Sequence, residues 1–332
     1  MREMVAMRFR PFDHLNENPE LIFRLFEQVY GDSRAIRQRW EWEFLHHPKT
    51  ERIQIFVAES GEGELVGMTV RMPCDLRVGT DVYPVFFATN SMVVPHYRGQ
   101  GIIRQLYALA AESGALQLSK GTEPLLQHQL RKMGYREIEP NTYQVCLLAP
   151  WNYILSRLTG TPSQPRISNK GLSAYSDYVP VDRFSADFNG LSPSEMAVTQ
   201  KNADELNWRY IDVPHRRYSC YARSMNGRIV SWCAFHWTER NAILTDLRWN
   251  HSEKDEPRRT IQFAKAMARS RGAIKLTCWA THSGLRKELA REFFMVRRES
   301  PWFGFFSHDT RWQDICLSEA HFVHGDGDMD YV

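Results

Sequence analysis

Apolar and polar positions follow two different periods along the chain, and together they predict an α/β protein. Leu21, Leu25 and Val29 lie four residues apart, which is the spacing of one helix face. Segments 53–58 and 65–71 have strand composition and flank a glycine-bearing turn, which predicts a β-hairpin. The elements expected in the first half are strands near 5–12, 53–58, 65–71, 86–94 and 115–119, and helices over 19–30, over 102–113 and, capped by Thr122, up to Gly134.

The same pattern occurs twice. Trp42 recurs as Trp208, 166 positions later, within an element of the form Trp-x-Phe/Tyr-x-x-x-Pro. Four residues of the following hairpin recur 164 positions later, where Ala58, Ser60, Gly63 and Val66 become Ala222, Ser224, Gly227 and Val230. The second half is therefore expected to hold a helix over 195–206, strands over 218–223 and 228–236, and a strand over 243–249.

The repeat divides the chain into two predicted domains. Residues 1–146 form the first and residues 178–332 the second, because the polar segment 147–177 between them is punctuated by proline and glycine. A chain of 332 residues, 43% of them hydrophobic, can bury a core of this size.

The strand over 86–94 passes into the helix over 102–113 through the stretch Val-Val-Pro-His-Tyr-Arg-Gly-Gln-Gly, residues 93–101. Gly99 and Gly101 let the backbone approach a ligand, and the N–H groups of a first helical turn have no intrahelical partner. Arg98 adds a planar cation suited to phosphate. This turn is therefore predicted to bind a phosphate or pyrophosphate group.

The stretch resembles the acyl-CoA signature of the GCN5-related N-acetyltransferase (GNAT) superfamily: Gln or Arg, two residues, Gly, one residue, then Gly or Ala. Arg98, Gly101 and Ile103 occupy these places, and Ile103 is a departure. The resemblance implies two tandem GNAT-like domains, each a mixed, mainly antiparallel sheet flanked by helices. It implies acetyl-CoA or another short acyl-CoA as co-substrate, bound by Met92, Val93, Val94, Arg98, Gly99, Gln100, Gly101, Ile102, Ile103 and Arg104.

The second copy lacks such a motif. Segment 250–257 holds three acidic residues and no glycine, which makes a poor anion site. The second domain is therefore interpreted as degenerate, with one cofactor site in each chain.

The resemblance further implies that a neutral amine attacks the thioester directly. The polar candidates for orienting the substrate or a water are Asn90 and Ser91 beside the motif, with Asp246 at the comparable strand position of the second copy. His236 and His128 are weaker candidates, since a lone histidine is more often structural. Leu130 stands where many relatives carry a tyrosine as general acid, so the acid is left open.

Charge and composition narrow the remaining classes. The 42 Lys and Arg against 39 Asp and Glu give a net charge of +3, and no nucleic-acid module is recognised. No run of eighteen apolar residues or apolar signal core is present, so a cytoplasmic protein without membrane contact is expected. The six cysteines form no Cys-x-x-Cys pair, and the His321-x-x-His324 tail with Asp326, Asp328 and Asp330 is interpreted as a terminal cap, so no metal is expected.

Segment 254–298 holds twelve basic residues against four acidic ones. Such a run is typical of a solvated helix face, or of a surface that receives a phosphorylated substrate. The hypothesis is an acyl-CoA-dependent N-acyltransferase for a small amine, with an amino sugar nucleotide, as in bacterial tandem-domain relatives of polysaccharide pathways, as the narrower expectation. The alternatives are a peptide, polyamine or aminoglycoside acceptor and a non-catalytic acyl-CoA sensor, and a homodimer is left open.

Overall fold

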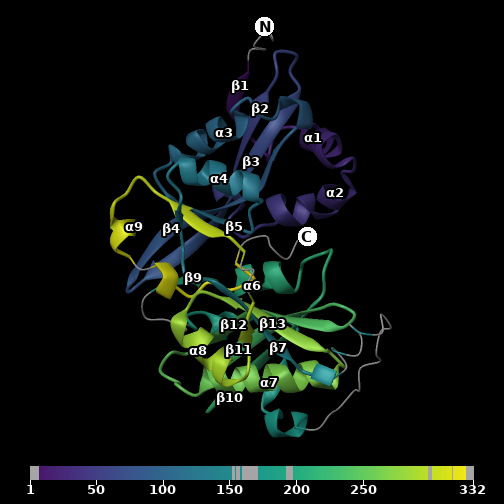
Figure 1. Ribbon diagram of the computed structural model, residues 1–332, viewed down its shortest axis with the longest axis vertical. Helices are drawn as coiled ribbons and strands as arrows, with labels where there is room; N and C mark the ends of the chain where they lie inside the picture. The colour runs from purple at the N-terminus through teal and green to yellow at the C-terminus, as the bar shows by residue number, and fades with distance from the viewer. Residues whose placement is uncertain are drawn as a thin grey trace.

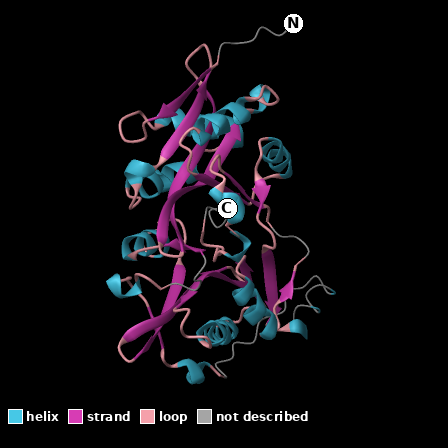
Figure 2. Cartoon of the chain, turned by 90° about the vertical axis from the view of Figure 1, so that its left-hand side faces the viewer, coloured by secondary structure: helices cyan, strands magenta, loops and turns pink. Residues whose placement is uncertain are grey.

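The computed structural model describes residues 7–151, 154, 158, 171–191, 197–297, 301–315 and 317–326. Within these ranges the chain forms two mixed sheets that follow one another along the long axis of the molecule (Figure 1). Figure 2 shows helices beside the strands of both sheets. The sequence-based expectation of an α/β chain with two mixed, mainly antiparallel sheets is confirmed.

Among the described residues, the first sheet runs in the order β1-β2-β3-β4-β5-β15-β6, and β9 pairs with β3. Its strands are β1 (Arg8–Phe12), β2 (Gln54–Glu59), β3 (Leu65–Val78), β4 (Asp81–Val93), β5 (Leu116–Lys120), β6 (Arg136–Glu137), β9 (Ala197–Gln200) and β15 (Phe303–Phe306). The helices of this half are α1 (Glu20–Tyr30), α2 (Arg34–Trp40), α3 (Ile102–Ala111) and α4 (Pro124–Lys132), and a π-helical turn, Glu41–Leu45, follows α2.

The second sheet runs in the order β14-β7-β13-β12-β11-β10-β8 within the described ranges. Its strands are β7 (Thr142–Leu147), β8 (Tyr178–Pro180), β10 (Tyr218–Met225), β11 (Arg228–Trp237), β12 (Asn241–Trp249), β13 (Lys275–Ala280) and β14 (Met295–Val296). The helices of the later part of the chain are α6 (Ala203–Tyr210), α7 (Glu256–Ser270), α8 (Ser283–Arg291) and α9 (Arg311–Asp314).

Two local predictions are wrong. Residues 197–200, expected in a helix, form strand β9, which pairs with the far end of β3 from Asp75 to Val78. The β-branched Val198 and Thr199 are buried in this sheet, and the helix begins only after Asn202, which caps it together with Glu205. The helix expected to start at Thr122 has residue 123 at its N-cap instead.

Among the described strands, three cross between the halves, and β9, which pairs with β3, is one of them. β7, at the end of the predicted first domain, pairs with β13 in the second sheet. β15, from the second half of the sequence, pairs with β5 in the first sheet. The largest apolar core accordingly joins residues from both ends of the chain, among them Phe87, Trp279, Phe303 and Phe322. The two sheets are therefore interlocked. Each sheet contains a strand from the other predicted domain, so the division of the sequence differs from the division into sheets.

The repeat in the sequence is a repeat in the fold. Strands β2 to β5 are neighbours in the first sheet and β10 to β13 in the second, and the last pair of each set, β4 with β5 and β12 with β13, is parallel. At the end of each third strand the same contact recurs: the Val94 N–H donates to Val66 O, and the Asn250 N–H donates to Val230 O, both over 2.9 Å.

The equivalent tryptophans meet. The rings of Trp42 and Trp208 stack with centroids 4.6 Å apart and planes 10° from parallel. Each indole Nε1–H donates to the backbone carbonyl of the other tryptophan, over 2.7 Å in both directions. This reciprocity is what a two-fold axis between the repeats requires, so the pair marks an approximate symmetry axis between the halves.

Because the stack and two buried hydrogen bonds join the halves here, Trp42→Phe and Trp208→Phe are each expected to destabilise the chain by about 1 kcal/mol, the typical contribution of one hydrogen bond. Chemical denaturation measures this, and the double variant should show coupling because the two residues are in contact. Trp151→Phe is the matched control, since Trp151 is 75% exposed. Equal effects at Trp42 and Trp151 would contradict the prediction.

Candidate functional site

Strands β4 and β5 separate part-way along their length. Their parallel pairing runs from Val85 and Leu116 to Ala88 and Ser119 and ends there, although β4 continues to Val93. Directly after this point β4 carries a bulge, where two residues, Asn90 and Ser91, face one residue of β3. Asn90 has φ of 46°, so its backbone is left-handed. Beyond this point β4 has no paired strand on the β5 side among the described residues, and this gap in the pairing is called the opening.

The stretch after β4 has the geometry of an anion site. A 3₁₀ turn, Pro95–Tyr97, is followed by Gly99 and Gly101 with φ of 82° and 77°. Gly101 is the N-cap of α3, and no side chain of the described residues caps this helix. The first-turn N–H groups therefore point outward at the positive end of the helix dipole. Exposed Arg98 is tied to the strand end, since its Nε donates to Val93 O over 3.0 Å.

The start of α3 is held close to the sheet. A Cβ on Gly67 of β3 would lie 3.0 Å from Ile102 Cγ2 and 3.2 Å from Met92 O, so only glycine leaves room for this approach. The departure from the signature at Ile103 leaves the helix end open, because that side chain is half-buried in the apolar clusters around Tyr107 and Leu106. Gln100 and Arg104 are exposed beside the glycines.

Comparison with known families agrees with this geometry. Residues 16–114, which contain β4, the turn and α3, match the acetyltransferase (GNAT) domain. This part of the chain is a GNAT acetyltransferase domain. Acyl-CoA is therefore the co-substrate, and the class of enzyme is an acyl-CoA-dependent N-acyltransferase. No curated protein sequence matches the chain.

Solved structures extend the likeness in fold beyond the GNAT domain. A probable N-acyltransferase from Enterococcus faecalis is 13% identical, with 91% of this chain and 72% of that chain aligned at a TM-score of 0.60. Saccharomyces cerevisiae N-myristoyltransferase with bound myristoyl-CoA is 12% identical, with 92% and 80% aligned and a TM-score of 0.57. A GCN5-related N-acetyltransferase from Anabaena variabilis is 13% identical, with 91% and 74% aligned and a TM-score of 0.59.

Asn90 of the GNAT domain contacts a carboxyl that the sequence did not reveal. Its amide Nδ2 donates over 2.9 Å to Glu43 Oε1, and its Oδ1 accepts from Arg39 over 3.1 Å. Glu43 is fully buried and forms an ion pair with Arg39 over 2.7 Å. Burial raises the pKa of Glu43, although Arg39 and Asn90 oppose the shift. A buried carboxyl with a raised pKa beside the bulge is a candidate general base.

A cavity of about 70 Å³ reaches β4 at Thr89. Thr89, His47 and Trp208 line it, together with Met72, Pro73, Cys74, Phe87, Gln200, Lys201, Glu205, Arg209, Gly325 and Asp326. The Thr89 hydroxyl is buried and has no hydrogen-bond partner among the described residues. An unpartnered hydroxyl in a cavity indicates a polar ligand or water there.

His47 presents a neutral ring to this cavity. Burial lowers its pKa to about 3, and the charges of Lys49, Arg52 and Arg209 add to the effect. His47 Nδ1 accepts the backbone N–H of Lys49 over 2.9 Å. The proton of the neutral ring therefore sits on Nε2, and His47 is a hydrogen-bond donor to the cavity.

An open groove of about 630 Å³ lies over the tryptophan pair and shares Trp208 with the cavity. Five pairs of its lining residues are related by the 166-position repeat, namely Gln38 and Asp204, Glu41 and Asn207, Trp42 and Trp208, His46 and Asp212, and Pro48 and Pro214. The groove thus follows the approximate two-fold axis, and Trp208 stands between it and the cavity.

Ser91 lies on the opposite face of the sheet. Its Oγ is 2.9 Å from the Tyr107 hydroxyl of α3 and 2.7 Å from Thr69 Oγ1. The two polar residues of the bulge therefore lie on opposite faces of the sheet, Asn90 on the side of α2 and Ser91 on the side of α3.

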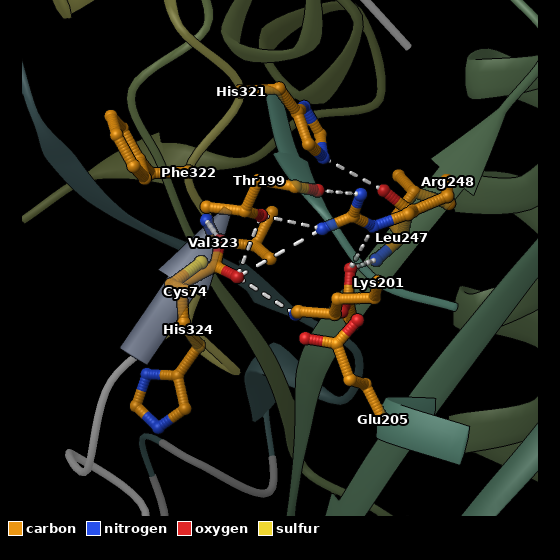
Figure 3. Close-up of polar contacts among 12 residues, drawn as sticks. Cys74, Thr199, Lys201, Glu205, Leu247, Arg248, His321, Phe322, Val323 and His324 are labelled. Atoms are coloured by element: carbon orange, nitrogen blue, oxygen red, sulfur yellow. Dashed lines mark hydrogen bonds and ion pairs between the residues drawn. The ribbon is translucent and has the colours of Figure 1, made fainter. Parts of the chain in front are cut away.

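Asp246 pairs with Lys201 and Arg248, two buried or nearly buried cations that Figure 3 labels. Its Oδ2 accepts from Lys201 Nζ and from the Tyr210 hydroxyl, each over 2.7 Å, and Lys201 also pairs with Asp326. Burial favours a raised pKa, but Lys201 and Arg248 outweigh it and hold the pKa of Asp246 well below its usual range. A carboxylate so stabilised is a poor proton acceptor.

The second copy has its own opening, between β12 and β13. Their parallel pairing ends at Leu244 and Cys278, and β12 has an irregularity there, as β4 does. The C-terminal segment occupies this opening: Val323 bridges Ala280 of β13, and the Gly325 N–H donates over 2.8 Å to Thr245 O of β12.

Close packing fixes that segment. A Cβ on Gly325 would lie 2.2 Å from the Tyr210 hydroxyl oxygen, and His321 shares a 2.9 Å hydrogen bond with Leu247 O. Figure 3 shows residues 321–324 beside Arg248 and Lys201. The chain thus fills the place that the GNAT domain leaves open, which supports the interpretation of the second copy as degenerate.

The other candidates lie elsewhere. His128 is on the exposed side of α4, and His236 is on β11 in the second sheet, beside Tyr218. The terminal histidines and Asp326 are engaged within the protein, since His324 Nδ1 contacts the Tyr143 hydroxyl and Asp326 pairs with Lys201. No group of metal-binding side chains occurs among the described residues, and Asp328 and Asp330 lie outside them.

Part of the basic run over 254–298 is ion-paired within the described residues. Arg258 and Lys265 bind Glu292, and Arg259 binds Asp177. This favours the interpretation of a solvated, ion-paired helix surface. Among the helices that the structure describes, none is both long and apolar enough to cross a bilayer.

If the turn before α3 binds the pyrophosphate of CoA, Gly101→Ala should weaken CoA binding at least about tenfold, which corresponds to roughly 1.4 kcal/mol. The left-handed backbone resists a side chain, so the N–H groups move. Gly114→Ala is the matched control, because Gly114 has a similar φ of 70° and open surroundings at the other end of α3. Calorimetry with CoA measures both, and equal affinities would contradict the assignment.

Proposed function

We propose that the chain transfers a short acyl group from CoA to a small-molecule amine. One observation carries this proposal: the cavity meets β4 at Thr89, next to the bulge, on the face opposite the α3 turn. Neighbouring strand residues alternate between faces, and Phe87 packs with α1 whereas Ala88 packs with Tyr107 of α3. Donor and acceptor can therefore reach the same backbone from opposite sides, which allows the amine to approach one face of the thioester carbonyl.

Glu43 is the base that we assign to this step. An amine arrives mostly protonated at neutral pH, so a proton must leave before attack. The Glu43 carboxyl is 2.9 Å from the Asn90 amide at the bulge, and burial raises the pKa of this carboxyl. Asn90 then orients this carboxyl, and the candidate catalytic role of Asn90 is one of positioning.

The cavity lining favours an acceptor whose reactive end is small. About 70 Å³ holds little more than an amine and its first carbons, and the rest of the acceptor would lie in the open groove beyond Trp208. Lys49 and Lys201 at this site pair with carboxylates, Glu205 and Asp326 among them. We therefore propose a small amine whose binding needs no phosphate, and amino sugar nucleotides are the alternative acceptor to be tested.

The deciding experiment is turnover of acetyl-CoA and longer acyl-CoAs with a panel of amines, read as release of free thiol. The panel contains amino sugars, their nucleotides, polyamines, aminoglycosides and a peptide amine. Turnover with a small amine supports the proposal. Tight CoA binding without turnover on any amine would instead favour a non-catalytic acyl-CoA sensor.

Glu43→Gln tests the base. Activity of the natural chain should fall as the pH drops through the raised pKa of Glu43, because only the carboxylate accepts a proton. The variant should lose about 10²-fold or more in kcat and lose this acidic limb. The free energy of unfolding should depend on pH in the opposite direction from activity. Burial disfavours the carboxylate, so the gain in stability on replacing Glu43 should be larger at high pH than at low pH.

The matched control is Glu51→Gln, an exposed carboxyl of the same half. A pH–rate profile and urea denaturation at two pH values separate the roles. An unchanged acidic limb in the Glu43 variant would remove this residue from the mechanism.

A further inference from the structure

Arg71 is a buried cation without a counter-ion in the described chain. It is 0% exposed on β3, and its Nη1 donates to Thr69 Oγ1 over 2.6 Å and to Val70 O over 3.1 Å. Its Nε and Nη2 have no hydrogen-bond partner, and no carboxylate pairs with it, among the described residues. Burying an unpaired guanidinium costs several kcal/mol, so such a group indicates an anion that is present in another state of the protein.

The cation lies under the opening between β4 and β5, on the side of the α3 turn. Its guanidinium carbon is 4.3 Å from the ring centroid of Tyr107 on α3. Tyr107 packs with Ala88, the residue at which β4 stops pairing with β5, and with Leu130 and Trp302. The opposite face of β3, at Val70 and Met72, belongs to the core under α1, so Arg71 faces the donor side.

A hydrogen-bond chain leads from Arg71 to Tyr107, and one arrangement of its protons runs outward from Arg71. Arginine only donates, so Thr69 Oγ1 is an acceptor from Nη1. The single Thr69 proton can then go to Ser91 Oγ, 2.7 Å away, and that of Ser91 to the Tyr107 oxygen, 2.9 Å away. In this arrangement the Tyr107 proton is free to be donated to a further acceptor, and Ser91 is the one hydrogen-bond partner of the Tyr107 hydroxyl recorded among the described residues.

We propose that this chain stabilises the CoA sulfur as it leaves. Tyr107 is the catalytic donor to the sulfur, and Arg71 is a positioning residue that acts through Thr69 and Ser91 and supplies positive charge. The inference rests on the proposed N-acyltransferase function. In the step, the amine nitrogen forms a bond to the acyl carbon, the C–S bond breaks, the sulfur keeps its electron pair as a thiolate, and the proton lost by nitrogen passes to the base.

The chain also gives a physical reason for Leu130. The buried Leu130 side chain packs in the same apolar cluster as Tyr107. A phenol reaching the opening from α3 makes a second one from α4 unnecessary. The acid that the sequence left open is thus assigned to a neighbouring helix.

The test compares Tyr107→Phe and Arg71→Met with the natural chain. Each variant should lose at least about tenfold in kcat, within the range of positioned proton donors, while the affinity for CoA near neutral pH changes less than twofold. The bound CoA thiol should titrate at least one pH unit lower in the natural chain than in either variant, followed by the ultraviolet absorbance of the thiolate. Tyr83→Phe on β4 and Arg77→Met on β3 are the controls, and desulfo-CoA gives the baseline.

The outcomes are distinct. CoA binding with the same thiol titration in all variants overturns this inference and leaves the proposed function intact, whereas no CoA binding by the natural chain overturns both. A preference for acyl groups that carry a carboxylate, lost only in Arg71→Met, would show that Arg71 binds the acyl group instead. Arg71→Met should also keep its resistance to urea, because the variant removes an unpaired buried charge. A large loss of stability with unchanged thiol titration would make Arg71 structural and sink the proposal.

Discussion

The end of the parallel pairing between β4 and β5 is the constraint on which the site depends. Backbone N–H and C=O groups must find partners when they leave water, and a strand that parts from its neighbour has none on that side. The bulge at Asn90 and Ser91 lies directly after the point where this happens in the first sheet. An extended ligand with amide groups can satisfy the freed backbone, and the turn before α3 lies at the end of the same strand to hold its phosphates.

In the second copy, the C-terminal segment of the chain satisfies the backbone groups that the parted strands leave unpaired. The opening between β12 and β13 contains residues 320–326, held by backbone hydrogen bonds and by the ion network around Lys201. Filling the opening with the chain itself makes this half rigid and lets it carry one wall of the cavity. In the proposed function, one copy of the duplicated fold binds the cofactor and the other supports it.

Much of this organisation can be predicted from the sequence, and the features that could not be predicted share one physical cause. The repeat, both hairpins, the α3 turn and its glycines follow from local patterns, since turns and helix starts depend on a few neighbouring residues. Pairing between distant segments does not. The crossing of β7 and β15, strand β9, and the C-terminal segment in the second opening depend on partners more than a hundred residues away.

The same distinction explains the site residues. Asn90 and Ser91 were found because they adjoin the motif, but Glu43, Arg71 and Tyr107 carry no local signature. A buried charge is recognised only once its surroundings are known. One signal was available in the repeat, because Glu43 aligns with Arg209 at the 166-position offset, and a change from acid to base at equivalent places indicates that the two copies have diverged electrostatically.

The same electrostatic difference distinguishes the surroundings of the bulge in β4 from those of the irregularity in β12. Asn90 and Asp246 occupy equivalent strand positions, 156 residues apart, as Val94 and Asn250 do. In the first copy a neutral amide meets the buried Glu43 carboxyl, and burial raises the pKa of this carboxyl although Arg39 pairs with it. In the second copy a carboxylate meets Lys201, and the pair stabilises the ionised form. A carboxylate that burial destabilises can accept a proton, whereas one that a lysine stabilises is a poor proton acceptor. The difference between Asn90 and Asp246 at this position is therefore consistent with a reactive role for the first bulge and a structural role for the second.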